Sequence, residues 1–424
     1  MKKSVGMMLS GALLVGLLSA CGGGGSGGTG EEATGGSETI TLNAIFMKQA
    51  GYSEDAINEA TAQFMEQNPN IKVENTFVPY ESLETKILTS NGNLDVALID
   101  APWTAKFVEA GILEEVTDKL PDADRADIFE GALSAVEYGG KLYGMPWLND
   151  TKYLFYNKEM LEQAGIAEVP ATWGELLEAA KIIKEQNIVE YPIVWSWKQA
   201  EALAVDFASI TESFGGHLVT DGQPTLNDPK NIEALEFMVQ SLQDGLSNPN
   251  SREFLEEDVR GTFSSGKAAF ALNWAYMYNL ANDPNESSVA GKVGIAIDPG
   301  TDGIVSASTN GGMGLAIPAG SGHPDEAWQF IQFLASKDFQ KAHAKDAMPI
   351  WKSLFEDEAV IATNPDLVNV SKEQYKYLIN RPQVPWYGEL STELQVAVSK
   401  ALLGNVTPEQ ALNDLQAKAI EMVE

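Results

Sequence analysis

The stretch from Gly140 to Lys158, GKLYGMPWLNDTKYLFYNK, places the tightest constraint on how this chain can fold. It contains two strand-like segments, 141–147 and 152–156, joined by the polar, turn-prone residues 148–151. A strand that ends one region and a strand that opens another, with so few residues between them, is typical of a crossing between two domains. We therefore expect a two-domain fold arranged around this stretch.

The chain begins with a segment typical of an export signal. Lys2 and Lys3 precede an uncharged apolar run over residues 5–20, which is too short and too poorly flanked for a membrane span. The run ends in Leu18-Ser19-Ala20-Cys21, which resembles the bacterial lipobox of a leucine, two small residues and a cysteine. That resemblance implies cleavage after residue 20 and lipidation of Cys21. The alternative is an ordinary cleavage site followed by an incidental cysteine.

A tether follows the expected lipidation site. Residues 22–38, GGGGSGGTGEEATGGSE, are rich in glycine, serine and threonine and too poor in apolar residues to fold. As a flexible coil, such a segment reaches on the order of 20 to 25 Å. We expect it to hold a globular body near a membrane. Since Cys21 is the only cysteine, no disulfide is expected within the chain.

Charge and length bear on partners and on domain number. The formal net charge is -32, and it becomes -34 without the leader, because Lys2 and Lys3 leave with it and no acid does. So acidic a body repels nucleic acid and anionic lipid headgroups, which argues against both as partners. About 400 residues remain after the leader, more than one hydrophobic core usually serves, so two lobes are expected.

Strand-like and helix-like segments alternate before the crossing. Strands are predicted over 39–46, 71–77 and 95–99, with helices over 53–67 and from about residue 80 to 87 between them. This alternation is typical of a parallel α/β lobe. Because ligands of such sheets lie beyond the carboxyl ends of the strands, it points to residues 46–49 and 100–103.

The alternation continues after the crossing. Strands are predicted over 191–195, before Trp274, and over 293–297, and one helix is predicted to start with a capping box of Thr172 and Glu175. A further crossing is predicted near residues 348–351. Two helices end the chain, and Thr407 and Gln410 are predicted to form a second capping box at the last one.

The sequence lacks the motifs of common enzyme classes. His217, His323 and His343 are isolated, with no histidine or cysteine at metal-ligand spacing. Neither a G-x-S-x-G elbow nor a Walker A motif is present. With 60 acidic residues, some pair will always mimic a glycosidase site, so such pairs carry no information. We therefore expect no enzyme, no metal and no cofactor.

Motifs around the crossing resemble a known family. They are Gly140-Lys141, Tyr143-Gly144, Pro146, Tyr156-Asn157-Lys158, Ala164-Gly165 and the helix start PATWGEL over 170–176. They resemble the extracellular solute-binding proteins of ABC importers, in particular the sugar-binding group of the maltose and trehalose type. The segments FSSGKAAFALNW over 263–274 and STNGGMGLAIP over 308–318 resemble further parts of that family, the second being its return crossing. The resemblance covers nearly all of the mature chain.

This resemblance implies an α/β type II binding-protein fold, with two Rossmann-like lobes joined by a three-segment hinge. It implies a signal peptide over 1–20, a lipidated linker over 21–38, an N-lobe over 39–149 and 310–349, and a C-lobe over 150–309 and 350–424. The implied function is capture of a mono- or disaccharide and its delivery to an ABC transporter permease. The implied location is the outer face of the cell membrane, with the protein a monomer.

A neutral sugar offers paired hydroxyls and apolar C–H faces, so its site needs carboxylates or amides together with aromatic rings. Such residues lie at strand ends and crossings here. The predicted ligand-binding set is Gln49, Asp100, Trp103, Trp147, Asp150, Trp195, Trp197, Trp274, Gly311, Gly312, Met313, Trp351, Arg381 and Trp386. The resemblance implies that Trp274 stacks on the sugar, that Asp100 contacts it and that the Gly311-Gly312 backbone approaches it.

Several of these residues have other interpretations. Asp100 also suits the cap of a helix at Pro102, Asp150 a hinge turn, and Gly311-Gly312 a tight turn. Met313 stands where relatives often have a bulky aromatic, and this leaves the identity of the sugar open. A ligand such as a glycerol phosphodiester or a peptide is the alternative, weakened for phosphate by the scarcity of arginine. A secreted glycan-active enzyme is a further alternative.

Overall fold

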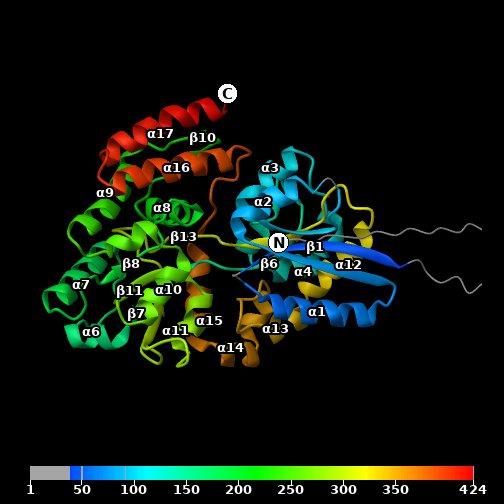
Figure 1. The fold of residues 1–424 in the computed structure, drawn as a ribbon, viewed down its shortest axis with the longest axis horizontal. Helices are drawn as coiled ribbons and strands as arrows, with labels where there is room; N and C mark the ends of the chain where they lie inside the picture. The colour runs from blue at the N-terminus through cyan, green and yellow to red at the C-terminus, as the bar shows by residue number, and fades with distance from the viewer. Residues whose placement is uncertain (1–38, 49–50, 91, 424) are drawn as a thin grey trace, which may run out of the picture. The chain divides into compact units, whose positions relative to one another are not determined.

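The computed structural model describes residues 39–48, 51–90 and 92–423. The expected export signal, Cys21, the tether and Gln49 lie outside the described residues. Residues 39–424 form one compact unit. Within it, strands and helices gather in two groups (Figure 1). One surrounds β1 (Ile40–Met47) and β6 (Met145–Leu148), and the other surrounds β7 (Lys152–Asn157), β8 (Ile193–Val194) and β11 (Phe270–Trp274).

The first group surrounds a five-stranded sheet of order β2-β1-β3-β14-β6. β1 (Ile40–Met47) is parallel to β2 (Ile71–Val78) and to β3 (Val96–Asp100), as the alternation of strands and helices predicts. β14 (Met313–Ala316) is antiparallel to β3 and to β6 (Met145–Leu148). All five residues of β3 are buried, as expected of a central strand with helices on both faces. We call this sheet with its helices the first lobe.

The second group surrounds a four-stranded sheet of order β12-β7-β11-β8. Its strands are β12 (Val293–Ala296), β7 (Lys152–Asn157), β11 (Phe270–Trp274) and β8 (Ile193–Val194). Side chains alternate across β7: Tyr153 and Phe155 join one core cluster, and Leu154 joins the other. We call this sheet with its helices the second lobe.

Two predicted strands are shorter than expected. The segment 191–195 is a strand only at Ile193–Val194, because the backbone N–H groups of Trp195 and Trp197 bond to Ser251 instead of a strand. The segment 141–147 divides into β5 (Lys141–Leu142) and β6. β5 pairs with β4 (Glu137–Tyr138) in a small hairpin. The other short ladders are β9 (Val219–Thr220) with β10 (Gln223–Pro224), and β13 (Ser308–Thr309) with β15 (Leu378–Ile379).

Helices cover both sheets. Before the first crossing they are α1 (Glu54–Gln67), α2 (Tyr80–Leu88), η1 (Ala101–Trp103), α3 (Thr104–Glu109), η2 (Thr117–Lys119), α4 (Asp122–Asp127) and α5 (Glu130–Ser134). The second lobe continues with α6 (Lys158–Ala164), α7 (Trp173–Glu185), α8 (Glu201–Ser213), α9 (Pro229–Gln243), η3 (Pro249–Glu253), α10 (Glu256–Ser264) and α11 (Tyr276–Asn282). After β14 come α12 (Pro324–Leu334), α13 (Lys337–Ala342), η4 (Lys352–Glu356), α14 (Glu358–Thr363), α15 (Pro365–Gln374), η5 (Tyr375–Tyr377), α16 (Tyr387–Leu402) and α17 (Pro408–Val423).

One predicted capping box is confirmed and the other is half formed. At α7, Thr172 accepts from the backbone N–H of Glu175, and the Glu175 carboxylate accepts from the N–H of Thr172. At α17, Thr407 accepts from the N–H of Gln410 at 3.1 Å. The Gln410 side chain, however, donates to Asp414 at 2.6 Å, one turn further on, and so does not complete the box.

Three passages connect the lobes. The first joins β6 to β7, and the second joins β12 to β14 through β13. They lie against each other, because the Thr151 hydroxyl oxygen is 2.9 Å from both the Ser308 hydroxyl and the Thr309 carbonyl oxygen, within hydrogen-bonding distance of each. The third leaves the first lobe after Trp351, which forms a bridge with Ile128, and reaches the second lobe where α15 packs against β12. The chain then returns to the hinge, where β15 pairs with β13.

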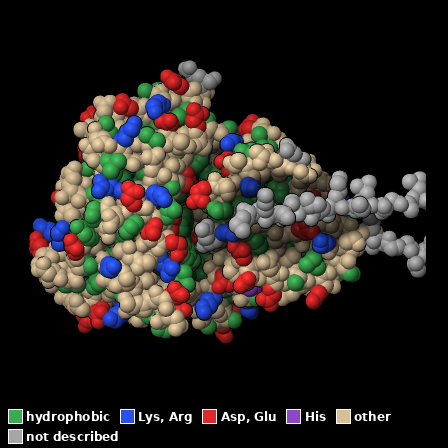
Figure 2. Space-filling view, viewed as in Figure 1, with side chains coloured by type: hydrophobic (Ala, Val, Ile, Leu, Met, Phe, Trp, Pro, Cys, Tyr) green, Lys and Arg blue, Asp and Glu red, His purple; other side chains and the backbone are tan. Residues whose placement is uncertain are grey.

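The described residues contain no helix that is both long enough and apolar enough to cross a membrane. Acidic and basic side chains are interspersed over the face drawn in Figure 2, with apolar side chains between them.

Candidate functional site

A buried carboxylate at the end of β3 is the centre of a polar cluster. One oxygen of Asp100 accepts from the N–H of Ala101 at 2.9 Å. Asp100 therefore caps η1, as its alternative interpretation as a helix cap predicts. Both oxygens also accept from Nη2 of Arg381, at 2.8 and 2.9 Å. The hydroxyl of Tyr80 donates to Oδ2 at 2.7 Å. Asp100 is therefore both a cap and a partner of side chains from distant elements.

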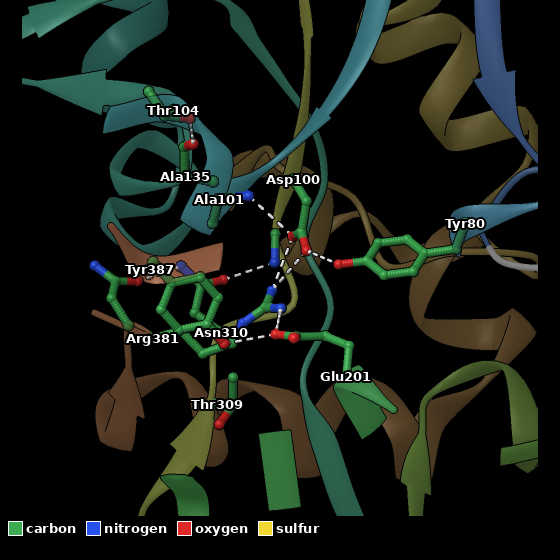
Figure 3. A network of polar contacts seen from close by, with 12 residues as sticks. Tyr80, Asp100, Ala101, Thr104, Ala135, Glu201, Thr309, Asn310, Arg381 and Tyr387 are labelled. Carbon is green, nitrogen blue, oxygen red and sulfur yellow. Dashed lines mark hydrogen bonds and ion pairs between the residues drawn. The ribbon is translucent and has the colours of Figure 1, made fainter. Parts of the chain in front are cut away.

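The second lobe contributes Glu201 to this cluster. Glu201 is the first residue of α8, and its Oε1 accepts from Nη1 of Arg381 at 2.8 Å and from the hydroxyl of Tyr387 at 2.5 Å. Figure 3 shows Tyr80, Asp100, Glu201, Arg381 and Tyr387 pointing toward one another. We call these five residues the Arg381 cluster. It links the end of a strand in the first lobe to α8 in the second.

Burial and charge oppose each other in the Arg381 cluster. The pKa of the Asp100 carboxyl is raised, because the effect of burial outweighs the lowering by Arg381 and by the Tyr80 hydroxyl. Burial alone would lower the pKa of Arg381, but the neighbouring Asp100 and Glu201 carboxylates raise it well above its ordinary value. Arg381 therefore stays charged, and two carboxylates face one guanidinium. With both ionised, the cluster carries a net charge of about -1.

A second set of predicted residues meets where β11 ends. Gly311, in the second passage, lies so close to the Trp274 ring that a Cβ at this position would be 2.4 Å from Cζ3. The indole N–H of Trp274 donates to Glu256 at 3.3 Å, and Nζ of Lys152 lies 5.3 Å from the ring centroid. The absence of a side chain at Gly311 is thus what lets the hinge backbone approach this ring.

Asp150 belongs to the same place. Its Oδ1 accepts from the N–H groups of Thr151 at 2.9 Å and Ala275 at 3.3 Å, and its carbonyl accepts from the N–H of Gly311 at 2.9 Å. Burial raises the pKa of the Asp150 carboxyl to about 7. We call Asp150, Lys152, Glu256, Trp274 and Gly311 the Trp274 cluster.

Lys152 of this cluster has a buried carboxylate partner. Its Nζ donates to Asp206 at 2.5 Å and to Ser196 at 2.9 Å, and both ionic side chains have no exposed surface. An unpaired charge would be very costly at such depth, so the pair neutralises itself.

The second passage runs between the two clusters. The side-chain oxygen of Asn310 accepts from the backbone N–H of Gly312 at 2.8 Å. The backbone N–H of Asn310 donates to the Ile379 carbonyl at 2.7 Å. Met313, the first residue of β14, is paired in register with Asp100. The structure thus brings Asp100, Asp150, Trp274, Gly311, Gly312, Met313 and Arg381 to one region beside the hinge.

Two further predicted residues lie beside the Arg381 cluster. Trp103 packs on Tyr80 with ring centroids 5.3 Å apart. Trp386 is partly buried and directly precedes Tyr387.

Four predicted tryptophans are not in this region. Trp147 is 1% exposed, and its indole N–H donates to the Leu334 carbonyl inside the first lobe. Trp351 donates likewise to the Ala335 carbonyl. Trp195 and Trp197 have no exposed surface and stack on each other at 4.7 Å in the second lobe. Large rings at strand ends are equally suited to filling a core, so their position in the sequence does not distinguish a ligand contact from a core residue.

The predicted ligand-binding set lacks Tyr80, Lys152, Glu201, Glu256 and Tyr387. Glu201 and Glu256 are two of 60 acidic residues, and each lies in the first turn of a helix, where acids are common for local reasons. Lys152 could have been noticed, because a lysine that opens an otherwise apolar strand requires a buried partner. In the described residues, no group of three histidine, cysteine or acidic side chains is placed to hold a metal ion.

Comparisons with known proteins bear on the family and the fold of this chain. The family model of the bacterial extracellular solute-binding proteins matches residues 50–341. A protein of Deinococcus radiodurans, described as a probable ABC transporter-binding protein, is 29% identical over 337 residues, which cover 77% of this chain and 79% of that protein.

Two solved structures share the fold at similar identity. Maltose-bound MalE3 of T. maritima has a TM-score of 0.82 and 28% identity, over 90% of this chain and 99% of its own. A solute-binding protein of an ABC transporter from Thermotoga lettingae, bound to α-D-tagatose, has a TM-score of 0.81 and 26% identity, over 91% and 100% of the two chains.

Proposed function

Because this chain belongs to the bacterial extracellular solute-binding proteins, we propose that it captures a mono- or disaccharide between its lobes and delivers it to an ABC transporter permease. The observation that carries the sugar assignment is the meeting of carboxylates, an arginine and aromatic rings beside the hinge. Planar polar groups suit the hydroxyls of a sugar, and Trp103 and Trp274 suit its apolar faces. Relatives with bound maltose and tagatose support the same ligand class.

We propose that capture works by closure of the lobes. The first lobe supplies Asp100 and Trp103, and the second supplies Trp274, so a ligand touching all three favours the closed form. A permease that recognises the closed form would then receive only loaded protein. We retain 39–149 with 310–349 and 150–309 with 350–424 as the proposed lobes. Membership of the two sheets supports this division for the strands before residue 350, whereas Trp351 forms a bridge with Ile128 of the first lobe.

The proposed ligand contacts are the predicted residues that lie near the hinge: Asp100, Trp103, Asp150, Trp274, Gly311, Gly312, Met313, Arg381 and Trp386. Gln49, which lies outside the described residues, remains a proposal from the sequence. We propose that Trp147, Trp195, Trp197 and Trp351 support the lobes and do not touch the ligand, because their rings pack inside the lobes, away from both clusters.

The ligand proposal is tested by thermal unfolding of residues 39–424 with a panel of mono- and disaccharides, glycerol phosphates and short peptides. A ligand at 100 times its dissociation constant stabilises by about 2.7 kcal/mol, which should raise the unfolding temperature by several degrees. Trp274→Ala should lose this shift, and Trp328→Phe, a buried change on α12 away from both clusters, should keep it. A response only to phosphates or peptides would replace the sugar as the ligand.

We further propose that Cys21 carries a lipid that holds the protein at the outer face of the cell membrane. The leader and the lipobox-like sequence support this, and the extracellular family supports export. Cell fractionation of the full chain tests the anchor. Cys21→Ser should release the protein from the membrane fraction, while Ser26→Ala in the tether should not. If the serine variant stayed with the membrane, the anchor would have to lie elsewhere.

A further inference from the structure

An arginine in a binding site usually marks an anionic ligand, because its guanidinium matches carboxylate and phosphate groups. Arg381 departs from this pattern. Its side chain is 4% exposed. Its Nη2 donates to both carboxylate oxygens of Asp100, and its Nη1 donates to the carboxylate of Glu201 at 2.8 Å. Both outer nitrogens of the guanidinium are therefore already bound to carboxylates of the protein itself.

Unlike the two Nη atoms, the Nε–H of this arginine is buried and has no hydrogen-bond partner among the described residues. A single N–H can donate to a hydroxyl or ether oxygen of an uncharged ligand. It cannot form the paired contact that a carboxylate or phosphate makes with a guanidinium. The unmet hydrogen-bonding capacity of Arg381 thus suits a neutral oxygen.

Glu201 is held firmly in the position that neutralises Arg381. Three donors reach its carboxylate: Arg381, the hydroxyl of Tyr387 and the hydroxyl of Ser391. Tyr387 and Ser391 lie on α16, and Glu201 opens α8, whose amino-terminal end favours a negative charge. The carboxylate is therefore fixed by two helices that meet at this point.

The charge balance near the hinge follows from this arrangement. When both are ionised, Asp100 and Glu201 together exceed the charge of Arg381 by one. Lys152 in the Trp274 cluster lies beside two carboxylates, Asp206 at 2.5 Å and Glu256 at 3.8 Å. A ligand carboxylate entering here would meet net negative charge at short range. Unfavourable like-charge contacts of this kind commonly exclude the wrong partner from a binding site.

We propose that Glu201 determines specificity: by occupying and neutralising Arg381, it makes the site select uncharged sugars and exclude the corresponding uronic acids. This inference rests on the proposed function, because it concerns the same site. Glu201 acts through Arg381 and is a positioning residue, so its effect lies in the ratio of two affinities and not in stability alone.

The test is calorimetric titration of the mature chain with matched sugar pairs. D-glucose, D-galactose, D-mannose and their uronates are compared at about pH 8, where the uronate carboxyl is ionised. Wild type should bind the preferred neutral sugar at least about tenfold more tightly than its uronate. Glu201→Gln, which keeps the shape and removes the charge, should bring this ratio close to one.

Two control variants separate charge from geometry. Glu236→Gln removes one negative charge from the exposed face of α9 and should leave the ratio as in wild type. Tyr387→Phe removes a donor to Glu201 but no charge, so it should change both affinities together. If Glu201→Gln does not fold, Glu201→Ala removes the same charge at a side chain that is 20% exposed and so can admit water.

A uronate that binds wild type as tightly as its neutral partner would overturn charge exclusion, and a folded Glu201→Gln with an unchanged ratio would overturn the role of Glu201. If no sugar binds, whether neutral or acidic, the proposed function fails and this inference fails with it.

Discussion

Arg381 and Asp100, 281 residues apart in the chain, share two hydrogen bonds of 2.8 and 2.9 Å in a buried ion pair. The pair joins the carboxyl end of β3 to the segment that precedes α16, and Glu201 extends it to α8. This contact requires both segments to be in their folded positions. Its energetics therefore report on the assembled molecule.

Arg381→Met should strongly destabilise the fold. The change leaves Asp100 and Glu201 buried without their cation, and breaking a buried ion pair in this way costs about 3 to 5 kcal/mol. Urea unfolding measures the loss. Lys230→Met, which breaks an exposed pair with Glu233, is the matched control and should cost less than about 1 kcal/mol. Equal losses in the two variants would mean that the buried Arg381 pair contributes no more to the free energy of unfolding than an exposed pair does.

Lys152 and Asp206 should behave as one unit. Lys152→Met leaves the Asp206 carboxylate buried and unpaired, so we expect a loss of about 3 to 5 kcal/mol. Adding Asp206→Leu should recover much of that stability, because an apolar pair no longer requires compensation. A double-mutant cycle by urea unfolding gives the coupling energy. Simple addition of the two single losses would contradict the structure.

Gly311→Ala should disturb the Trp274 ring. Its Cβ would lie 2.4 Å from the ring, so the ring or the hinge backbone must move, at a cost of about 1 to 3 kcal/mol. Weaker sugar binding should accompany the loss, because Trp274 leaves its position. Gly261→Ala on α10 is the control: no atom comes within 4 Å of its Cβ, and alanine should stabilise this helix by about 0.5 to 1 kcal/mol.

Asp298 should make stability fall as the pH rises. Both of its carboxylate oxygens are buried and lack a hydrogen-bond partner within the described ranges, and burial raises its pKa from 3.8 to about 7. Between these values the folded protein holds a proton that the unfolded chain has lost. The contribution of Asp298 to stability is therefore complete below the lower value and is lost as the pH rises to about 7.

Asp298→Asn removes this titration. Compared with wild type, the variant should gain up to roughly 4 kcal/mol between pH about 4 and about 8, at about 1.4 kcal/mol per pKa unit. Urea unfolding over this pH range measures the difference in the free energy of unfolding between the variant and wild type. The other titrating groups are common to both proteins, so their contributions cancel in this difference. A difference that stays constant with pH would show that Asp298 titrates normally.

Local sequence patterns predicted most of the fold. The alternation of apolar residues located β1, β2, β3 and α1 to within a residue or two at most boundaries, because side chains of these elements bury one face against a core. The place of β14 required the family resemblance. It pairs antiparallel between β3 and β6, and no local pattern in Met313–Ala316 specifies those distant partners.

The candidate site was harder to predict than the fold. Asp100 and Trp274 follow from their positions at strand ends, where the sheet leaves side chains free to meet other elements. Trp195 also lies beyond a strand, yet it is buried and its indole N–H donates to Ser247 at 2.7 Å. Glu201 gave no signal, since its importance comes from Arg381, which lies 180 residues away.

The contact between Gly311 and Trp274 has an evolutionary consequence. While residue 274 is a tryptophan, a side chain at position 311 collides with its ring, so the two positions form an epistatic pair. One order of mutation is therefore favoured: a smaller residue at position 274 removes the cost of a side chain at position 311. Lineages that have lost the ring should vary at both positions together, and those that keep it should retain glycine beside it.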